Sequence, residues 1–205
     1  MLTMTRKAAL VICIFLLASF LLLPPVPPPA RACQGKIVRC SVNYDGIQGN
    51  ALSSAPVITP DGRYIAFASA ASNLVPGDTN GVTDVFRKDL QTGKIERCST
   101  STSGVQGNGD CERVAISDDG RYVAFCSTAS NLVSGDTNGK HDVFRKDMGT
   151  GEMKRCSVSK SGTQGDQKSY RLSMSADGRY IAFESWATNL VEGDTNNTCD
   201  IFRKD

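Results

Sequence analysis

The sequence is poor in the side chains that most catalytic and metal sites need. Among 205 residues it has one histidine, His141, and one tryptophan. A single histidine leaves a histidine-based catalytic triad or a zinc centre almost without ligands. Charge of one sign is also lacking, because 23 Lys and Arg stand against 21 Asp and Glu. Nothing in this balance favours nucleic acid or an acidic membrane surface as a partner. No segment shows a helical period.

The first 32 residues differ in kind from the rest of the chain. Arg6 and Lys7 precede an apolar run over 8–23, a proline-rich stretch and an A-x-A sequence that ends at Ala32. This order is typical of a secretory signal. We therefore expect cleavage after Ala32, a secreted or periplasmic domain over 33–205, and no membrane span after cleavage. The alternatives are an uncleaved N-terminal membrane anchor and a lipoprotein modified at Cys33.

What the chain does have is an internal repeat of 58 residues without gaps. A polar loop followed by a short strand occurs three times, as DTNGVTDVFRKD at 78–89, DTNGKHDVFRKD at 136–147 and DTNNTCDIFRKD at 194–205. A second motif, DGRY, recurs with the same period and begins at Asp61, Asp119 and Asp177. Such a period is the signature of a fold built from repeated units.

Each repeat contains four runs that predict strands. In the middle copy they are 113–117, 122–127, 142–146 and 153–158. An Asp-Gly turn between the first two predicts a hairpin, and 122–127 is apolar on both faces, which predicts cover on both sides. We expect an all-β fold, a β-propeller of three four-stranded blades at about 43–100, 101–158 and 159–205 plus 36–42. A β-sandwich has no reason for a gapless repeat, and a β-solenoid normally has a shorter period.

The two ends of the repeat region complement one another. Segment 36–42 matches the fourth strand of the other repeats, whereas the last repeat stops after its third strand. Three blades are fewer than the four to eight of known propellers. Our hypothesis is a homodimer that forms a six-bladed ring, in which each chain lends 36–42 to the other and covers an open sheet edge. The alternative is that the chain is part of a longer protein.

The cysteines do not form an obvious disulfide framework. Cys40, Cys98 and Cys156 occupy one repeat position and thus fall in different blades, so we expect them to act as small buried apolar residues. The disulfide that the spacing favours most is Cys111 with Cys126, because the Asp-Gly turn between them would bring two strands side by side.

The segment TPDGRYIAF at 59–67, with its copies at 117–125 and 175–183, resembles the WD40-like PD40 repeat of TolB-type β-propellers. The sequence SNLVSGDTNG at 130–139 is similar to an exported bacterial branch of that group. The resemblance covers 36–205 and implies the fold, together with a general role as a scaffold or binding platform. Because one propeller fold serves many functions, it does not imply a ligand.

Alternate loops of a four-stranded meander lie on the same side, so 128–141 and 159–170 should share one polar face where a ligand would bind. The Asp-x-Asn-x-x-x-Asp spacing offers oxygen atoms that suit Ca²⁺, although it differs from the EF-hand pattern. The other interpretation is that these side chains only hold turns. The candidate binding or calcium residues are Asp78, Asn80, Asp84, Asp136, Asn138, Asp142, Asp194, Asn196 and Asp200.

Together these observations favour a non-enzymatic, exported binding or scaffold module that presents its long polar loops to a protein or glycan partner. One alternative is a hydrolase or lyase with its site on the same loop face. Another is a structural module stabilised by calcium. No cofactor other than calcium is expected.

Overall fold

The computed structural model describes residues 35–205. The predicted signal over 1–32 lies outside the described residues, and its cleavage stays a prediction. Residues 38–205 form one compact unit. Within 35–205 there is no helix that could cross a membrane.

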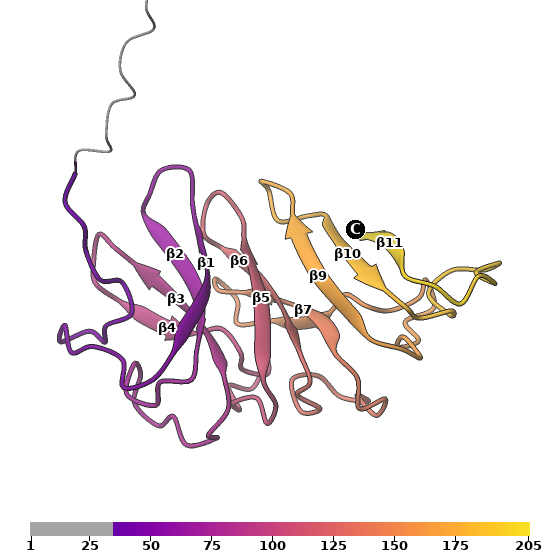
Figure 1. Ribbon diagram of the computed structural model, residues 1–205, viewed down its shortest axis with the longest axis horizontal. Coiled ribbons are helices and arrows are strands. Elements are labelled where there is room, and N and C mark those ends of the chain that lie inside the picture. The colour runs from indigo at the N-terminus through magenta and orange to yellow at the C-terminus, as the bar shows by residue number, and fades with distance from the viewer. Residues whose placement is uncertain (1–34) are drawn as a thin grey trace, which may run out of the picture. The chain divides into compact units, whose positions relative to one another are not determined.

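The unit consists of three antiparallel sheets whose strands follow chain order (Figure 1). The first sheet contains β1 (Ser53–Ile58), β2 (Tyr64–Ser69), β3 (Asp84–Asp89) and β4 (Ile95–Arg97). The second contains β5 (Cys111–Ile116), β6 (Tyr122–Ser127), β7 (Asp142–Asp147) and β8 (Met153–Arg155). The third contains β9 (Ser169–Met174), β10 (Ile181–Ser185) and β11 (Asp200–Lys204). The all-β prediction is confirmed.

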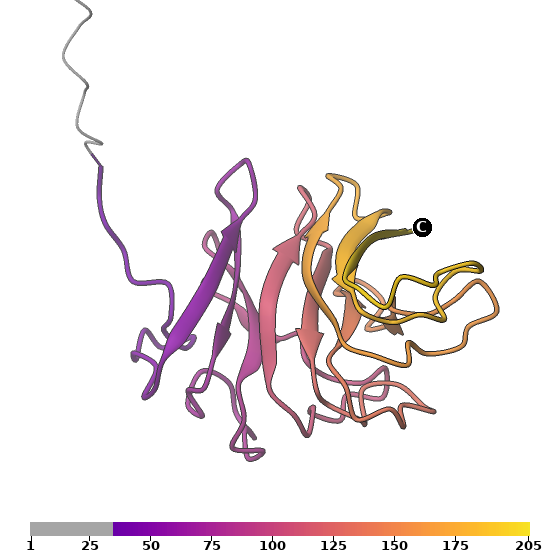
Figure 2. The same ribbon diagram turned by 45° about the vertical axis from the view of Figure 1, so that its right-hand side comes forward.

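The sheets stack face to face like consecutive propeller blades. Strand β5 packs on β1, β2 and β3, and β9 packs in the same way on β5, β6 and β7. Figure 2 shows the three sheets one after another, with the second between the other two. This arrangement is consistent with part of a β-propeller. The number of blades in a complete ring and the predicted oligomer remain predictions.

The hydrophobic core lies between the sheets. One cluster joins the first and second sheets through Val85, Val123 and Phe125. Another joins the second and third through Ala124 and Ile181. Strand β6 therefore contributes alternate residues to both clusters, which explains why its sequence is apolar on both faces.

Strand boundaries differ from the predicted ones where the backbone is irregular. Strand β5 begins at Cys111, two residues before the predicted start, because its pairing with β6 resumes beyond a bulge at Arg113. Arg113 has a φ of 49° there. Strand β8 ends at Arg155 instead of 158, since the chain then turns into a short hairpin closed by a bridge between Val158 and Gln164.

Segment 36–42 is not a strand of any sheet in this chain. Its last residue, Val42, forms an isolated bridge with Gln48. The prediction that this segment serves as a fourth strand is thus not met within a single copy.

The predicted disulfide is wrong. Cys111 lies opposite Ser127, and Cys126 lies opposite Glu112. Since neighbouring residues of a strand point to opposite faces, the two thiols fall on opposite sides of the second sheet. Cys111 belongs to the core between the first and second sheets, and Cys126 to the core between the second and third. Both are free.

Adjacent blades are also joined at the DGRY turns. The ring of Tyr64 lies so close to Gly120 of the next blade that a Cβ there would come within 2.3 Å of it. Arg87 stacks on the same ring and donates to the Gly120 carbonyl at 2.6 Å. The contact recurs one blade further on, where Tyr122 covers Gly178 and Arg145 donates to the Gly178 carbonyl. Glycine is required at these turns by the close approach as well as by the positive φ of 71° at Gly120.

We expect Gly120→Ala to destabilise the protein more than Gly93→Ala. Both glycines have a positive φ, of 71° and 78°, which costs a residue with a Cβ roughly 1–2 kcal/mol. At position 120 the new Cβ also clashes with the Tyr64 ring, which should cost about 1–3 kcal/mol more of unfolding free energy. At position 93 the new Cβ would point into open space. Chemical denaturation of both variants measures the difference. Equal losses would contradict the proposed tyrosine contact.

In the first and second blades a carboxylate ties the two tight turns together. Asp147 accepts hydrogen bonds from the backbone N–H groups of Gly149 and Thr150 in the β7–β8 turn. It also accepts a hydrogen bond of 2.8 Å from Arg121, which lies in the β5–β6 turn. The Arg121 guanidinium lowers the pKa of Asp147. In the first blade, Arg63 lowers the pKa of Asp89 to about 2 in the same way.

Stability should fall in acid because of these pairs. A carboxyl whose pKa is lowered by folding contributes stability above its unfolded pKa, about 3.9 for aspartate, and loses it as the pH falls through the folded value. We expect the melting temperature to drop between about pH 4 and pH 2. Asp147→Asn should lower it at pH 7 and reduce the drop in acid. An acid profile that this variant leaves unchanged would refute the role of the pair.

Candidate functional site

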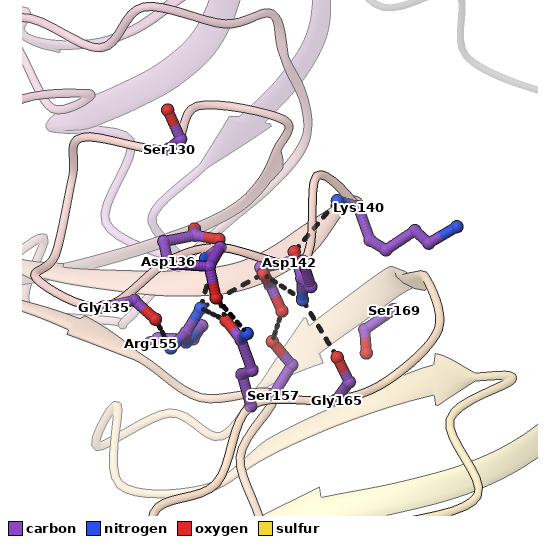
Figure 3. Close-up of polar contacts among 12 residues, drawn as sticks. Ser130, Gly135, Asp136, Lys140, Asp142, Arg155, Ser157, Gly165 and Ser169 are labelled. Carbon is purple, nitrogen blue, oxygen red and sulfur yellow. Dashed lines mark hydrogen bonds and ion pairs between the residues drawn. The ribbon is translucent and has the colours of Figure 1, made fainter.

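Side chains of the loop that precedes β7, and of the first residue of β7, surround one buried arginine, Arg155. Asp142 is the first residue of β7, and its side chain is 0% exposed. It accepts from Ser157 Oγ at 2.5 Å through Oδ1, and from Asn138 Nδ2 at 3.0 Å through Oδ2. The Nη1 of Arg155 lies 3.3 Å from Asp136 and 3.5 Å from Asp142 (Figure 3). We call this group, and its equivalents in the other repeats, the arginine-centred cluster.

The first repeat builds the same cluster. Arg97 lies 3.4 Å from Asp78 and 3.5 Å from Asp84. Ser99 donates to Asp84 at 2.5 Å, and Asn80 donates to it at 2.9 Å. Burial raises the pKa of Asp84, and the bonds from Ser99 and Asn80 partly offset that rise.

The clusters also connect one blade to the next. The Asn138 amide donates to the Gly165 carbonyl at 2.9 Å as well as to Asp142. Gln164, beside Gly165, accepts from Arg155 at 2.8 Å and donates to Thr137 at 2.8 Å. Since 158–168 is the link that leads into β9, the polar loop of one blade holds the start of the following blade.

The six predicted site residues of the first two repeats are therefore engaged with one another and with arginine. The carboxylates of Asp78, Asp84, Asp136 and Asp142 are at most 5% exposed and are bound by arginine. The guanidinium takes the place that a calcium ion would need. Nowhere in 35–205 do three acidic, histidine or cysteine side chains gather as metal ligands would. These contacts favour the other interpretation, in which the side chains hold turns and blade contacts, and calcium binding stays a prediction.

The third repeat brings together only part of the cluster. Asn196 donates to Asp200 at 3.0 Å as its equivalents do. Within 35–205, no arginine or serine side chain forms an ion pair or a hydrogen bond with the carboxylate of Asp194 or Asp200.

Three equivalent hollows lie beside the polar loops. Each is bounded by the hairpin that precedes a blade and by the β2–β3 type loop of that blade. In the second blade the hollow has a volume of about 730 Å³, with Leu132 and Val133 among its apolar residues and Ser101, Ser103 and Asn131 among its polar ones. The equivalents in the first and third blades measure about 450 Å³ and 910 Å³.

A second group of polar side chains, on the first strands of the blades, was missed by sequence reasoning. The hydroxyl of Tyr170 on β9 donates to Glu112 on β5, and the guanidinium of Arg113 lies 5.2 Å from the Tyr170 ring centre. The only histidine, His141, packs edge-on against the same ring at 5.4 Å. The bond to Glu112 raises the pKa of Tyr170. The available signal was that Ser54, Glu112 and Tyr170 share one repeat position, which unlike the cluster positions holds a different residue in each copy.

No family model matches the sequence. No curated protein matches it either. Similar solved structures include the tricorn protease, at 17% identity with a TM-score of 0.43. The match covers 66% of this chain and 11% of the protease chain. The β-propeller domain of the trilobed protease from Pyrococcus furiosus is 13% identical with a TM-score of 0.40, covering 76% of this chain and 43% of that one. A nidogen/laminin complex is 8% identical with a TM-score of 0.42, covering 75% and 44%.

The chain thus spans less than half the length of each of these proteins. At such identities and TM-scores the likenesses say nothing about activity. The assignment of blades depends on the sheets themselves, on their order and on the way each packs on the next.

Removing the central arginine should be costly. Arg155→Met leaves two buried carboxylates without a cation, and we expect a loss of about 3–5 kcal/mol. The matched control is Arg121→Met, which breaks an aspartate pair whose arginine side chain is 47% exposed and should cost about 0–1 kcal/mol. Replacing Asp136 and Asp142 by Asn should rescue Arg155→Met in part. Denaturant unfolding measures all three. A loss no larger than that of Arg121→Met would contradict the cluster.

Proposed function

We propose that the protein is an exported, non-enzymatic β-propeller module of the TolB-like kind that binds a glycan or an extended polar peptide through its three hollows. The observation that carries the proposal is the recurrence of one hollow in each blade. A single-blade feature would suit a compact ligand, whereas equivalent sites at a fixed period suit a ligand that is itself repetitive. Weak binding at each site then adds up through multivalency.

The lining of the hollows suits sugars. Hydroxyl and amide side chains both donate and accept hydrogen bonds, as sugar hydroxyls do, and an apolar floor provides a surface for a ring. In the third blade the hollow offers Ser159, Ser161, Thr163 and Asn189 around Leu190. Of the two partner classes, this composition favours a glycan.

The first hollow differs from the other two at one repeat position. It has Asp45 where the second and third have Ser103 and Ser161. The arginine-centred clusters keep the loops rigid, so that a variable residue can be presented at low entropic cost. The role of a scaffold or binding platform follows from this division between rigid support and variable surface.

One observation favours the alternative of a hydrolase or lyase. His141, Tyr170 and Glu112 are in contact, and all three residue types serve as general acids or bases. Glu112 and Tyr170 lie on the first strands of their blades and His141 ends the polar loop before β7, so the alternative would place the active site where that loop meets the first strands.

Binding to a panel of immobilised polysaccharides tests the proposal. We expect the double variant Ser103→Arg/Ser161→Arg to lose most of the binding that the wild type shows, because two hollows are filled. Gln91→Arg adds one arginine at an exposed turn residue away from the hollows and should bind as the wild type does, whereas each single variant, Ser103→Arg or Ser161→Arg, should already bind less. Equal binding by the double variant would refute the hollows as the site. Release of reducing sugar during incubation would favour the enzyme.

A further inference from the structure

Two basic side chains beside the first strand of the third blade lie on aromatic rings. The guanidinium of Arg113 lies 5.2 Å from the ring centre of Tyr170, and the Nζ of Lys168 lies 4.3 Å from the ring centre of Trp186. Both cations are exposed. Within 35–205 neither of them forms an ion pair with a carboxylate. We call these four residues the stacked-cation patch.

Other arginines that stack on a tyrosine already have an oxygen partner. Arg121 and Arg145 both lie over the ring of Tyr122. Arg121 also forms an ion pair with Asp147, and Arg145 also donates to the carbonyl of Gly178 in the next blade. Those arginines therefore join turns and blades, whereas the two cations of the patch keep their N–H donors for a ligand.

The bulge in β5 explains how Arg113 comes to lie over the third blade. Cys111 and Val114 are buried, and the two residues between them, Glu112 and Arg113, are both exposed. Neighbours in a regular strand point to opposite faces, but the extra residue of a bulge re-aims a side chain. The guanidinium is thus directed out of the core and onto the ring of Tyr170.

The two halves of the patch lie on one face of β9. Lys168 and Tyr170 are two residues apart at the start of this strand, so their side chains share a face and are separated by about 7 Å along it. The backbone N–H of Trp186 donates to the Lys168 carbonyl at 3.1 Å, which brings the indole beside the ammonium group. Strand β9 is an edge strand of the third sheet.

The acidic side chains near the patch are already engaged. Glu112 accepts a hydrogen bond from the Tyr170 hydroxyl. Asp166 accepts from the backbone N–H and the hydroxyl of Thr188 at 2.9 and 2.8 Å. Asp110 accepts from a backbone N–H of the first blade at 2.9 Å. The charges left to act on a ligand are therefore the two cations.

The patch is not a consequence of the repeat. The counterparts of Lys168, Tyr170 and Trp186 are Leu52, Ser54 and Ala70 in the first blade and Asp110, Glu112 and Thr128 in the second. The counterpart of Arg113 in the third blade is Arg171, which lies 3.6 Å from Glu184. Contacts that build a blade recur, so a contact made only once is free to serve a ligand.

We propose that the stacked-cation patch binds an extended acidic peptide that runs along β9. A guanidinium binds a carboxylate through two parallel hydrogen bonds, and an ammonium group acts as a point charge. Because each cation is already held by a ring, less side-chain entropy is lost on binding.

The spacing of the patch favours a peptide as the occupant. Alternate residues of an extended peptide lie on one face about 7 Å apart, which is the separation of Lys168 and Tyr170 along β9. A peptide laid beside an edge strand keeps this period. Acidic residues at every second position would therefore meet both cations. This site is separate from the three hollows and does not rest on the proposed function.

Fluorescence polarisation with labelled peptides tests the proposal on the full chain, purified as the cell processes it. The probe is a short peptide of alternating aspartate and glycine with capped ends. A peptide of the same composition, with its aspartates in adjacent pairs, has the same charge but directs neighbouring carboxylates to opposite faces. We expect the alternating peptide to bind more tightly, and a peptide with asparagine in place of aspartate not to bind.

Variants of the patch identify the site. Arg113→Gln/Lys168→Gln should weaken binding of the alternating peptide at least about 10-fold, as expected for the loss of charge-assisted hydrogen bonds. Arg113→Lys keeps the charge without the planar fork and should lose less. The matched control Lys94→Gln/Lys154→Gln removes two exposed charges beside the fourth strands and should bind as the wild type does. Circular dichroism checks each variant for folding.

The hollow variant Ser103→Arg/Ser161→Arg should bind the peptide like the wild type, which separates this site from the glycan site. Equal binding of the two aspartate peptides would overturn the match in spacing. Binding that Arg113→Gln/Lys168→Gln leaves unchanged, or a wild type that binds neither aspartate peptide, would overturn the proposal. Tighter binding of an acidic polysaccharide such as alginate at the same two cations would overturn the choice of a peptide.

Discussion

The structure depends on an aspartate buried at the start of the third strand of the first and second sheets. Removing a carboxylate from water costs several kcal/mol unless charges and hydrogen bonds replace the lost hydration. For Asp142 these come from Asn138 in the loop before it, from Arg155 on the fourth strand and from Ser157 just beyond. One side chain therefore fixes a loop and two strands.

Identical and variable repeat positions have different roles. The identical ones, such as the arginine-centred cluster and the glycine under each tyrosine, hold a blade together and join it to the next. The positions that differ face the hollows, as Ser103 does, or the first strands, as Glu112 and Tyr170 do. In a repeat protein, a motif that is prominent because it recurs is thus more informative about architecture, and ligand contacts are better sought where the copies diverge.

Much of the fold was predictable from the repeat and the two-residue period of its strands, which fix β6, β7 and the hairpin at Asp119. The disulfide was not, because the bulge at Arg113 shifts the pairing by one residue, and such a shift exchanges the two faces of a strand. The sequence singled out the polar loop but not the side chains that its aspartates contact. A pattern of aspartate and asparagine does not reveal that Arg155, 13 residues after Asp142, supplies the cation.

The central claim is that a buried arginine, and not a metal ion, holds the polar loops of the first two blades. An experimental structure determined in the presence of calcium tests it most directly. The account predicts that the guanidinium of Arg155 lies within about 4 Å of Asp136 and Asp142, the limit for an ion pair. A calcium ion bound by these two aspartates, with Arg155 displaced, would contradict it.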